Sequence, residues 1–219
     1  MAARRSIPAA RQRRRQRAGA AEYWLLLLGV VVFVVAVAGM MGPWRSASVP
    51  ATVVRPLTMA QARASNARVP IRERRRIRAA RFRFQGGPAA RAQAVDCLAT
   101  AALYEVGDDR REQAAVMQVV LNRVRAPGFP KTICGVVYQG SSRITGCQFS
   151  FTCDGSFRRR PIRSGWAAAR RTARRALNGH VDAAVGRATH YHADWVVPYW
   201  RDTLVKVARV GPHLYYQRH

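Results

Sequence analysis

An uninterrupted apolar run near the start divides this 219-residue chain into two unequal parts. Residues 23–41 read YWLLLLGVVVFVVAVAGMM, which is 19 positions without a charged side chain. That length is close to the ~20 apolar residues that a transmembrane helix needs to cross a bilayer. We therefore predict one membrane-spanning helix over residues 23–41, so that only the chain beyond it can build a water-facing folded domain.

The charges beside the apolar run predict its orientation. Residues 11–17 (RQRRRQR) precede the run, and basic flanks stay in the cytoplasm. Residues 1–22 are therefore expected to form a basic cytoplasmic N-terminus, residues 23–41 an uncleaved signal anchor, and residues 42–219 the part outside the cytoplasm. A cleavable signal peptide is the alternative, because Ala36 and Ala38 form an A-x-A cleavage pattern, although the run exceeds the ~7–15 residues of a typical signal core.

The chain is strongly basic, with 38 Lys plus Arg against 11 Asp plus Glu and a net charge of +27. Only Lys131 and Lys206 are lysines, so part of the excess is consistent with a coding bias toward arginine. Charge alone identifies no anionic partner. The sequence contains no internal repeat and no phosphate-binding glycine loop, and we expect no nucleic-acid partner.

Residues 42–91 contain five prolines and twelve arginines but few large apolar side chains. This composition predicts a basic disordered linker, with a short helix around residues 71–83. A solvated linker is the simplest role for it. Binding to anionic lipid or to a cell-wall polymer is the alternative.

Four cysteines, Cys97, Cys134, Cys147 and Cys153, all lie in the C-terminal part of the chain. Outside the cytoplasm four cysteines predict two disulfides, with three pairings that the spacing does not separate. A zinc site is the alternative, although these spacings lack the paired-ligand rhythm of zinc ribbons. We therefore expect no bound metal.

The folded domain is predicted over residues 92–219, a length sufficient for one compact core. Gly107 is placed to end its first helix, and Asp109 with Glu112 forms a capping box for the second. Helices first and a small sheet last define an α+β domain. Helices are expected over residues 92–106, 110–125, 131–138 and 165–177, and strands over residues 188–191, 204–210 and 213–216.

Glu105 is the most informative acidic residue, because it lies near the end of a helix that is otherwise apolar. It follows Leu98 by seven positions and shares an edge of the apolar stripe with it. A carboxyl group at that edge is partly removed from water, which favours its neutral, proton-donating form. A general acid needs that form near neutral pH. The alternative is a boundary glutamate that turns out to water.

Polar and aromatic residues beyond Glu105 gather in two segments, residues 148–154 (QFSFTCD) and residues 189–200 (THYHADWVVPYW). Aromatic faces beside hydrogen-bonding groups suit a sugar, whose rings have apolar C–H faces and hydroxyl rims. A packed aromatic core is the alternative. The residues of these segments that we predict to bind substrate are Gln148, Ser150, Asp154, His190, Tyr191, His192, Trp195 and Tyr199.

With these motifs in order, the chain resembles the SleB/CwlJ family of cell wall hydrolases, named for spore-cortex-lytic enzymes. The motifs are together specific, and the version with cysteines resembles the forms of non-sporulating Gram-negative bacteria, so no spore role is implied. The resemblance covers residues 95–217 and rests on residues 103–107 (LYEVG), 113–124 (QAAVMQVVLNRV), 129–130 (FP), 135–139 (GVVYQ), 147–155 (CQFSFTCDG) and 188–192 (ATHYH).

The resemblance implies a fold like that of lysozyme and lytic transglycosylases, in which a helical lobe carries the catalytic acid at a helix end and faces a small antiparallel β lobe. The family's catalytic glutamate maps to Glu105, although Val106 stands where the family commonly has alanine. Peptidoglycan is then the substrate, and residues 92–219 form a catalytic domain in the periplasm, held at the inner membrane by the N-terminal helix. No cofactor is implied, and the sequence names no regulatory partner.

The acidic residues of the domain favour a reaction that needs only one carboxyl group. Ordinary glycosidases place two carboxylates around the scissile bond, and only Asp154 and Asp194 remain as candidates for a second group. A lytic transglycosylase needs one, because the sugar's own C6 hydroxyl attacks and its high effective molarity replaces a second catalyst. We therefore predict that Glu105 alone drives cleavage between N-acetylmuramic acid and N-acetylglucosamine. A hydrolytic muramidase or glucosaminidase is the alternative.

Two further alternatives come from other classes of protein. His190, His192 and Asp194 on an extended strand would share one face and resemble a metal site, whereas hydrogen-bonded or sugar-binding histidines need no metal. The second alternative is a non-catalytic, wall-binding envelope protein in which Glu105 is structural.

Overall fold

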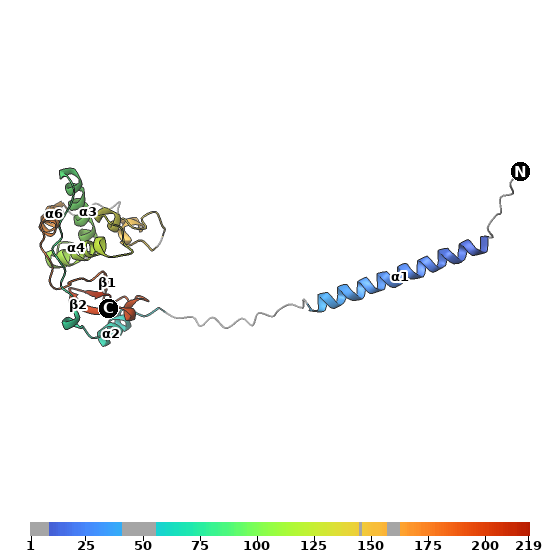
Figure 1. Ribbon diagram of the computed structural model, residues 1–219. Coiled ribbons are helices and arrows are strands. Elements are labelled where there is room, and N and C mark those ends of the chain that lie inside the picture. The colour runs from blue at the N-terminus through green and yellow to red at the C-terminus, as the bar shows by residue number, and fades with distance from the viewer. Residues whose placement is uncertain (1–8, 41–55, 145, 157–162) are drawn as a thin grey trace. The chain divides into compact units, whose positions relative to one another are not determined.

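The computed structural model describes residues 9–40, 56–144, 146–156 and 163–219 (Figure 1). The chain divides into two compact units, Met1–Arg55 and Pro56–His219. The first unit contains one helix, α1 (Ala9–Met40), whose large apolar side chains within residues 23–35 are exposed. Across the described residues, no helix combines the length and the hydrophobicity needed to cross a membrane. The predicted linker residues 42–55 lie outside the described part.

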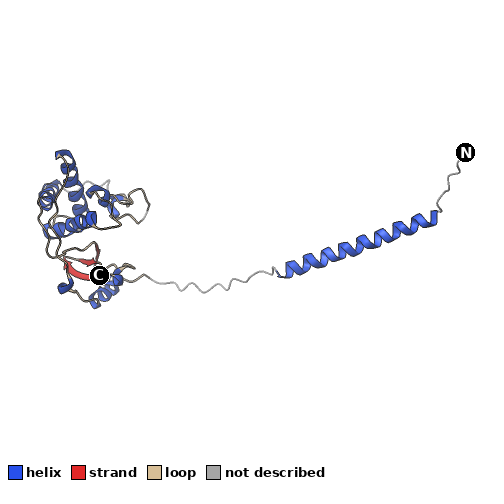
Figure 2. Cartoon of the chain, in the orientation of Figure 1, coloured by secondary structure: helices blue, strands red, loops and turns tan. Residues whose placement is uncertain are grey.

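Four helices form the helical lobe of the second unit, and their bounds follow the sequence pattern closely (Figure 2). The second helix spans the predicted residues, and the first begins four residues earlier than expected, with Pro88 in its first turn. Gly107, at φ +62°, ends the first helix as predicted. The helices are α3 (Pro88–Val106), α4 (Arg110–Arg125), α5 (Ile133–Val137) and α6 (Arg163–Leu177).

The core of this lobe joins the apolar stripes of the four helices. Leu98 and Ala102 of α3 and Val116 and Val120 of α4 are fully buried in it, together with Ala173 of α6. These positions recur at spacings of three and four, which is the period of one face of a helix. Packing of that face therefore fixes where α3 ends and where Glu105 lies.

A three-stranded antiparallel sheet forms the C-terminal lobe, in the order β1-β3-β2. The strands are β1 (His190–Ala193), β2 (Val205–Val210) and β3 (His213–Gln217), with Tyr191 opposite Tyr215. Short 3-10 helices lie at Glu73–Arg75, Ser150–Thr152 and Arg201–Thr203. The α+β class, the C-terminal hairpin and the small antiparallel sheet are confirmed.

The two faces of the sheet pack against different helices. Tyr215 and Val207 are buried in one cluster with Ala115 and Val119 of α4. On the opposite face, Lys206 donates from Nζ to the main-chain oxygens of residues 66 and 69, at 2.8 Å each, at the end of α2 (Met59–Arg68). The sheet is therefore enclosed between α4 and α2 (Figure 1).

The prediction of a disordered linker is wrong for residues 56–91. Thr58 and Gln61 form a capping box that starts α2, and Asn66 donates from Nδ2 to the main-chain oxygens of Asp194 and Val196. Within α2 only Ala62 and Asn66 are buried, so backbone and polar groups make most of its contacts. Composition does not reveal such a segment, because its order does not come from large apolar side chains.

The segment between α2 and α3, residues 69–85, crosses from the sheet to the helical lobe, and we call it the strap. Gln217 accepts from the main-chain nitrogen of Ile77 at 3.1 Å, and Arg125 of α4 donates to the main-chain oxygens of Ala80 and Arg81. The helix predicted over residues 71–83 is wrong, because the strap forms only the 3-10 turn Glu73–Arg75 there. Outside that turn, main-chain groups of the strap bind neighbouring elements, as in the bonds of Arg72 to Lys206 and of Ile77 to Arg187.

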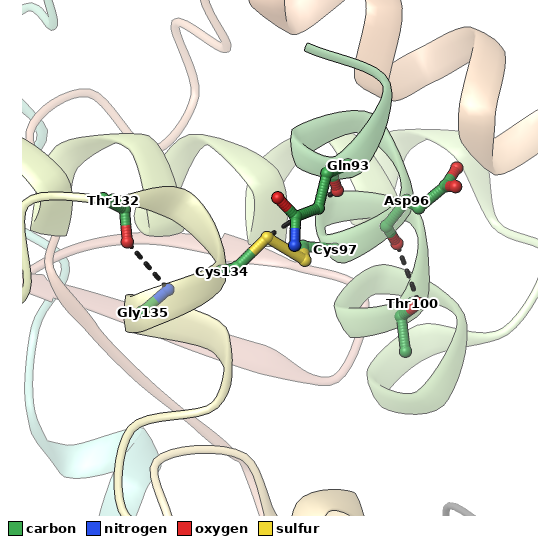
Figure 3. Close-up of a disulfide and its surroundings, with 7 residues drawn as sticks. All are labelled: Gln93, Asp96, Cys97, Thr100, Thr132, Cys134 and Gly135. Atoms are coloured by element: carbon green, nitrogen blue, oxygen red, sulfur yellow. Dashed lines mark hydrogen bonds between the residues drawn. A yellow bond between two sulfur atoms is a disulfide. The ribbon is translucent and has the colours of Figure 1, made fainter. Parts of the chain in front are cut away.

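Both predicted disulfides are present, and no described cysteine is free. The bond between Cys97 and Cys134 joins α3 to α5, beside the Thr132 side chain that caps α5 (Figure 3). The second bond, between Cys147 and Cys153, closes a loop before α6. A disulfide of this kind typically adds about 2–4 kcal/mol to stability, and the first one restrains the helix that carries Glu105.

Candidate active site

Glu105 lies in the last turn of α3 and points toward the sheet. The Tyr191 hydroxyl donates to Glu105 Oε2 at 2.9 Å. Gln113 of α4 donates from Nε2 to the Gly107 carbonyl at 2.6 Å, and this bond holds the end of α3 in place. Among the described residues, no cation forms an ion pair with the Glu105 carboxylate.

The surroundings of Glu105 favour its protonated form. Burial raises the pKa of this carboxyl group above its ordinary value, because the charged form loses hydration. The hydrogen bond from Tyr191 and the positive potential of His213 and Arg123 oppose that rise, whereas the charge of Asp154 adds to it. The group can therefore hold a proton nearer to neutral pH than an exposed glutamate does, as a general acid must.

Tyr191 is held in a fixed orientation by the aromatic residues around it. Its ring stacks on Tyr215 with centroids 5.6 Å apart, and it meets the edge of the His213 ring at 5.5 Å. Burial, and then the nearby Glu105 charge, raise the pKa of Tyr191 well above its ordinary value. The phenol therefore stays protonated and acts as a hydrogen-bond donor to the Glu105 carboxyl group.

Arg123 is a buried cation beside this pair. Its Nε donates to the main-chain oxygen of Thr189 at 2.7 Å, and its guanidinium lies 5.5 to 6.0 Å from the rings of Phe129, Phe149 and Tyr191. Burial lowers the pKa of Arg123 to about 10, so it remains charged at neutral pH. We assigned Arg123 no role from the sequence, although its spacing from Val119 and Val120 places it on the buried face of α4.

A second buried pair lies on the other side of Tyr191. Glu112 Oε2 lies 3.2 Å from His213 Nδ1, and both side chains are largely removed from solvent. Asp109 caps α4 by accepting from the Glu112 main-chain nitrogen, but Glu112 does not return the bond that completes a capping box, because its carboxylate turns to His213. The turn residue Gly211, at φ +55°, leaves room for that carboxylate: an added Cβ would lie 2.1 Å from Glu112 Oε1.

Two of the predicted substrate-binding residues, Gln148 and Ser150, lie in the loop that the second disulfide closes, and a third, Asp154, directly follows it. Gln148 accepts from Arg123 Nη1 and Nη2, at 3.0 and 3.3 Å, in the amide orientation that satisfies both groups. Ser150 is exposed at the start of a 3-10 turn. Asp154 is also exposed, accepts from the Ser156 main-chain nitrogen at 2.8 Å, and is close enough for its charge to raise the pKa of Glu105. The loop therefore borders Glu105.

The two predicted histidines lie on the opposite face of β1 from Tyr191. His192 bonds from Nε2 to the Tyr216 hydroxyl at 3.0 Å, and Thr189 Oγ1 lies 2.9 Å from His190 Nδ1. Both imidazole rings pack against Trp200, with centroids 5.2 and 5.5 Å away. Their binding of substrate beside Glu105 therefore stays a prediction with no contact to support it.

The remaining predicted residues lie beyond the end of β1. Trp195 packs against the Arg63 guanidinium at 5.6 Å, and Tyr199 is 97% exposed. Asp194 is buried between Arg63 and Arg209, with ion-pair distances of 3.0 and 2.8 Å. This pairing accounts for the Asp194 charge without any role in catalysis.

The metal alternatives have no support in the described part of the chain. No group of three or more His, Cys, Asp or Glu side chains there is arranged to hold an ion. His190, His192 and Asp194 each have other partners, and the four cysteines form disulfides. The side chains of the two metal sites that the sequence suggested therefore already have partners.

Comparison with known proteins identifies the family. The family profile described as Cell Wall Hydrolase matches residues 107–216, which is half of the chain. This chain belongs to the cell wall hydrolase family. The description of this family is that of hydrolases of the cell wall, which favours an enzyme over a non-catalytic wall-binding protein. The matched range begins just after Glu105, so the role of Glu105 depends on the geometry of the site.

Three known proteins are similar to this chain over part of its length. A spore cortex-lytic enzyme of Halalkalibacterium halodurans is 29% identical over 103 residues, which are 47% of this chain and 28% of that relative. The chain thus spans less than a third of the length of that relative. The crystal structure of the SleB catalytic domain of Bacillus cereus is 26% identical, with a TM-score of 0.48 over 62% of this chain and 95% of that one. The catalytic domain of the germination-specific lytic transglycosylase SleB of Bacillus anthracis is also 26% identical, with a TM-score of 0.47 over 61% and 99%.

Proposed function

We propose that this cell wall hydrolase cleaves peptidoglycan strands between N-acetylmuramic acid and N-acetylglucosamine as a lytic transglycosylase, with Glu105 as its acid and base. One observation carries the proposal: a carboxyl group whose pKa burial raises, with a neutral phenol as donor and no ion pair among the described residues. A buried carboxylate that served only structure would be expected to have a cationic partner.

The reaction begins when protonated Glu105 donates its proton to the glycosidic oxygen as the bond from that oxygen to C1 of muramic acid breaks. The carboxylate so formed accepts the Tyr191 hydrogen bond, and the nearby Arg123 guanidinium stabilises it further. These groups keep the pKa of Glu105 from rising so far that the proton could not leave.

Glu105 then acts as the base. Its carboxylate takes the proton from the C6 hydroxyl of the same muramic acid, and the C6 oxygen bonds to C1. This step restores the protonated acid, consumes no water and leaves a 1,6-anhydro end. The attacking hydroxyl is tethered to the reacting ring, so no second carboxylate is needed to position it.

The other acids near the site support a single-carboxylate reaction. Asp194 is neutralised by two arginines, and Glu112 is paired with His213. Among the described acidic residues, only Asp154 is both exposed and close enough to influence Glu105. Hydrolysis, with Asp154 positioning a water molecule, is the second candidate reaction.

Digestion of purified sacculi in ¹⁸O-labelled water distinguishes the two reactions. A transglycosylase incorporates no label, and each product is one water lighter than the hydrolytic product. Mass spectrometry should therefore find unlabelled 1,6-anhydro-muramic acid ends. Labelled reducing ends would refute the transglycosylase and direct attention to Asp154.

We also propose that the domain works in the periplasm, held by an inner-membrane anchor over residues 23–41. The support is the unbroken apolar run and its basic flank in the sequence. A reporter that is active only outside the cytoplasm, fused after His219, should be on. An inactive reporter would contradict this location.

A further inference from the structure

A cavity of about 310 Å³ lies where the strap, the end of α4 and the ends of β1 and β3 meet. Three arginines line it, Arg125, Arg187 and Arg218, and no acidic side chain does. Ile77 and Ala80 of the strap form one wall. This wall and Arg218 lie outside residues 107–216, so the family profile does not cover the whole lining of the cavity.

Two of the three arginines are available to a ligand. Arg125 is used by the fold, because it donates to the main-chain oxygens of Ala80 and Arg81 and lies over the Phe82 ring at 4.9 Å. Within the described residues, the guanidinium groups of Arg187 and Arg218 have neither a hydrogen-bond acceptor nor an ion-pair partner. A concave site with unpaired guanidinium groups binds planar oxyanions, which they contact in a bidentate geometry.

The local potential is positive as well. Burial, and then the neighbouring Arg187, lower the pKa of Arg125. Burial lowers the pKa of His190 to about 4, and the charges of Arg123 and Arg218 add to that shift. Both effects have the sign expected where cations gather without acids to balance them.

The cavity is connected to the candidate active site by three contacts. Thr189 lines the cavity, and its main-chain oxygen accepts from Arg123. Arg123 lies against the Tyr191 ring, and Tyr191 donates to Glu105. Thr189, Arg123 and Tyr191 thus form one series of contacts between the cavity and Glu105.

We infer that this cavity binds the carboxylates of the peptide stems that peptidoglycan carries on its muramic acid residues. The inference rests on the proposed function, since it takes the glycan strand to run past Glu105. The stem is the part of that polymer with free carboxylates, and it leaves the strand at the sugar whose C1 reacts. The cavity thus selects strands that keep their stems over bare glycan.

The test uses the full chain with Arg187→Gln and Arg218→Gln together. The substrates are intact sacculi and the same sacculi stripped of stems by an amidase that cuts after the muramic lactyl group. On intact sacculi the double variant should lose about tenfold in kcat/KM through KM, with kcat unchanged. On stripped glycan it should match the wild type.

A matched control removes the same charge elsewhere. Arg174→Gln with Arg175→Gln changes two exposed arginines of α6, neither of which lines the cavity. This control should match the wild type on both substrates. An equal loss in both double variants, or an equal loss on both substrates, would overturn the inference in favour of a general charge effect.

A binding measurement separates this inference from the proposed reaction. The free stem peptide released by the amidase should bind the wild-type chain in calorimetry, and the cavity variant should bind at least about tenfold more weakly. Stem peptide with its carboxylates converted to amides should not bind. If the wild type binds no stem peptide the inference fails, whereas binding without any glycan cleavage would refute only the proposed function.

Discussion

On one face of strand β1, Tyr191 donates a hydrogen bond to Glu105, and on the other face His190 and His192 pack around Trp200. Both faces are rich in aromatic rings and polar groups. On the His192 face these groups satisfy one another, through Tyr216, the sheet backbone and Thr189. On the Tyr191 face a half-buried carboxyl group has one neutral donor, without an ion pair among the described residues.

This difference between the two faces of β1 indicates which of them carries the reactive group. A dense run of His, Tyr and Trp is as compatible with a structural network as with a binding cleft. What distinguishes the Tyr191 face is a titratable group that the fold removes from water without neutralising it. The comparison therefore predicts that substitutions on the two faces affect different measurable quantities.

The largest effect on activity is expected from Glu105→Gln. A carboxamide keeps the shape and can accept the Tyr191 hydrogen bond, but it cannot transfer the proton, so the rate of sacculus lysis should fall about 10²-fold or more. Turbidity loss of a sacculus suspension measures this rate. Lysis within a few-fold of the wild type would remove Glu105 from the mechanism.

The same variant should be more stable than the wild type at neutral pH. Burial raises the folded-state pKa of Glu105, so the ionised form destabilises the fold. This cost is absent below the unfolded-state pKa, grows as pH rises through the interval between the two values, and is complete above the folded-state pKa. Thermal unfolding should therefore show a gain in Tm for Glu105→Gln at pH 7 that disappears at pH 4.

An intermediate effect is expected from Tyr191→Phe. The hydroxyl stabilises the Glu105 carboxylate, and loss of a hydrogen bond to a charged group should reduce kcat by roughly tenfold. Because that bond lowers the pKa of Glu105, its removal should raise the pKa further. The fall in activity as Glu105 deprotonates should then move to higher pH. A pH–rate profile unchanged from the wild type would show that the bond has no part in proton transfer.

The smallest effect on activity is expected from His192→Phe on the other face. It leaves the Tyr216 hydroxyl without its 3.0 Å partner, so stability should fall by about 1–3 kcal/mol in urea unfolding. At a temperature where the variant is folded, kcat should stay within about twofold of the wild type. A selective loss of kcat with unchanged stability would instead restore His192 to the substrate site.

Periodicity made much of the fold predictable. The cap at Asp109 predicted the start of α4 at Arg110, the Ala126-Pro-Gly sequence predicted its end at Arg125, and the turn at Gly211 predicted the C-terminal hairpin. The strap and α2 were not predictable, because their order depends on backbone and polar contacts made by residues such as Asn66 and Lys206.

The candidate site was predictable only in part. Glu105 stood out because a helix period places it at an apolar edge, but the partner of Glu112 is about a hundred residues away, and a local capping pattern could not reveal it. The alternation of strand residues could have separated Tyr191 from His190 and His192, since neighbours in a strand face opposite sides. Aromatic density alone grouped all three together.

The close approach of Gly211 to Glu112 limits how sequences of this kind can vary. Any side chain at position 211 would displace the carboxylate from His213 unless the residue at 112 became shorter in the same lineage. Related chains should therefore keep glycine at 211 wherever an acid or amide stands at 112, and should lose both together. The residue at position 211 of the hairpin turn is therefore constrained by Glu112 of α4, although the two lie far apart in the chain. A substitution at 211 would alter the surroundings of His213 and Tyr191 without replacing either residue.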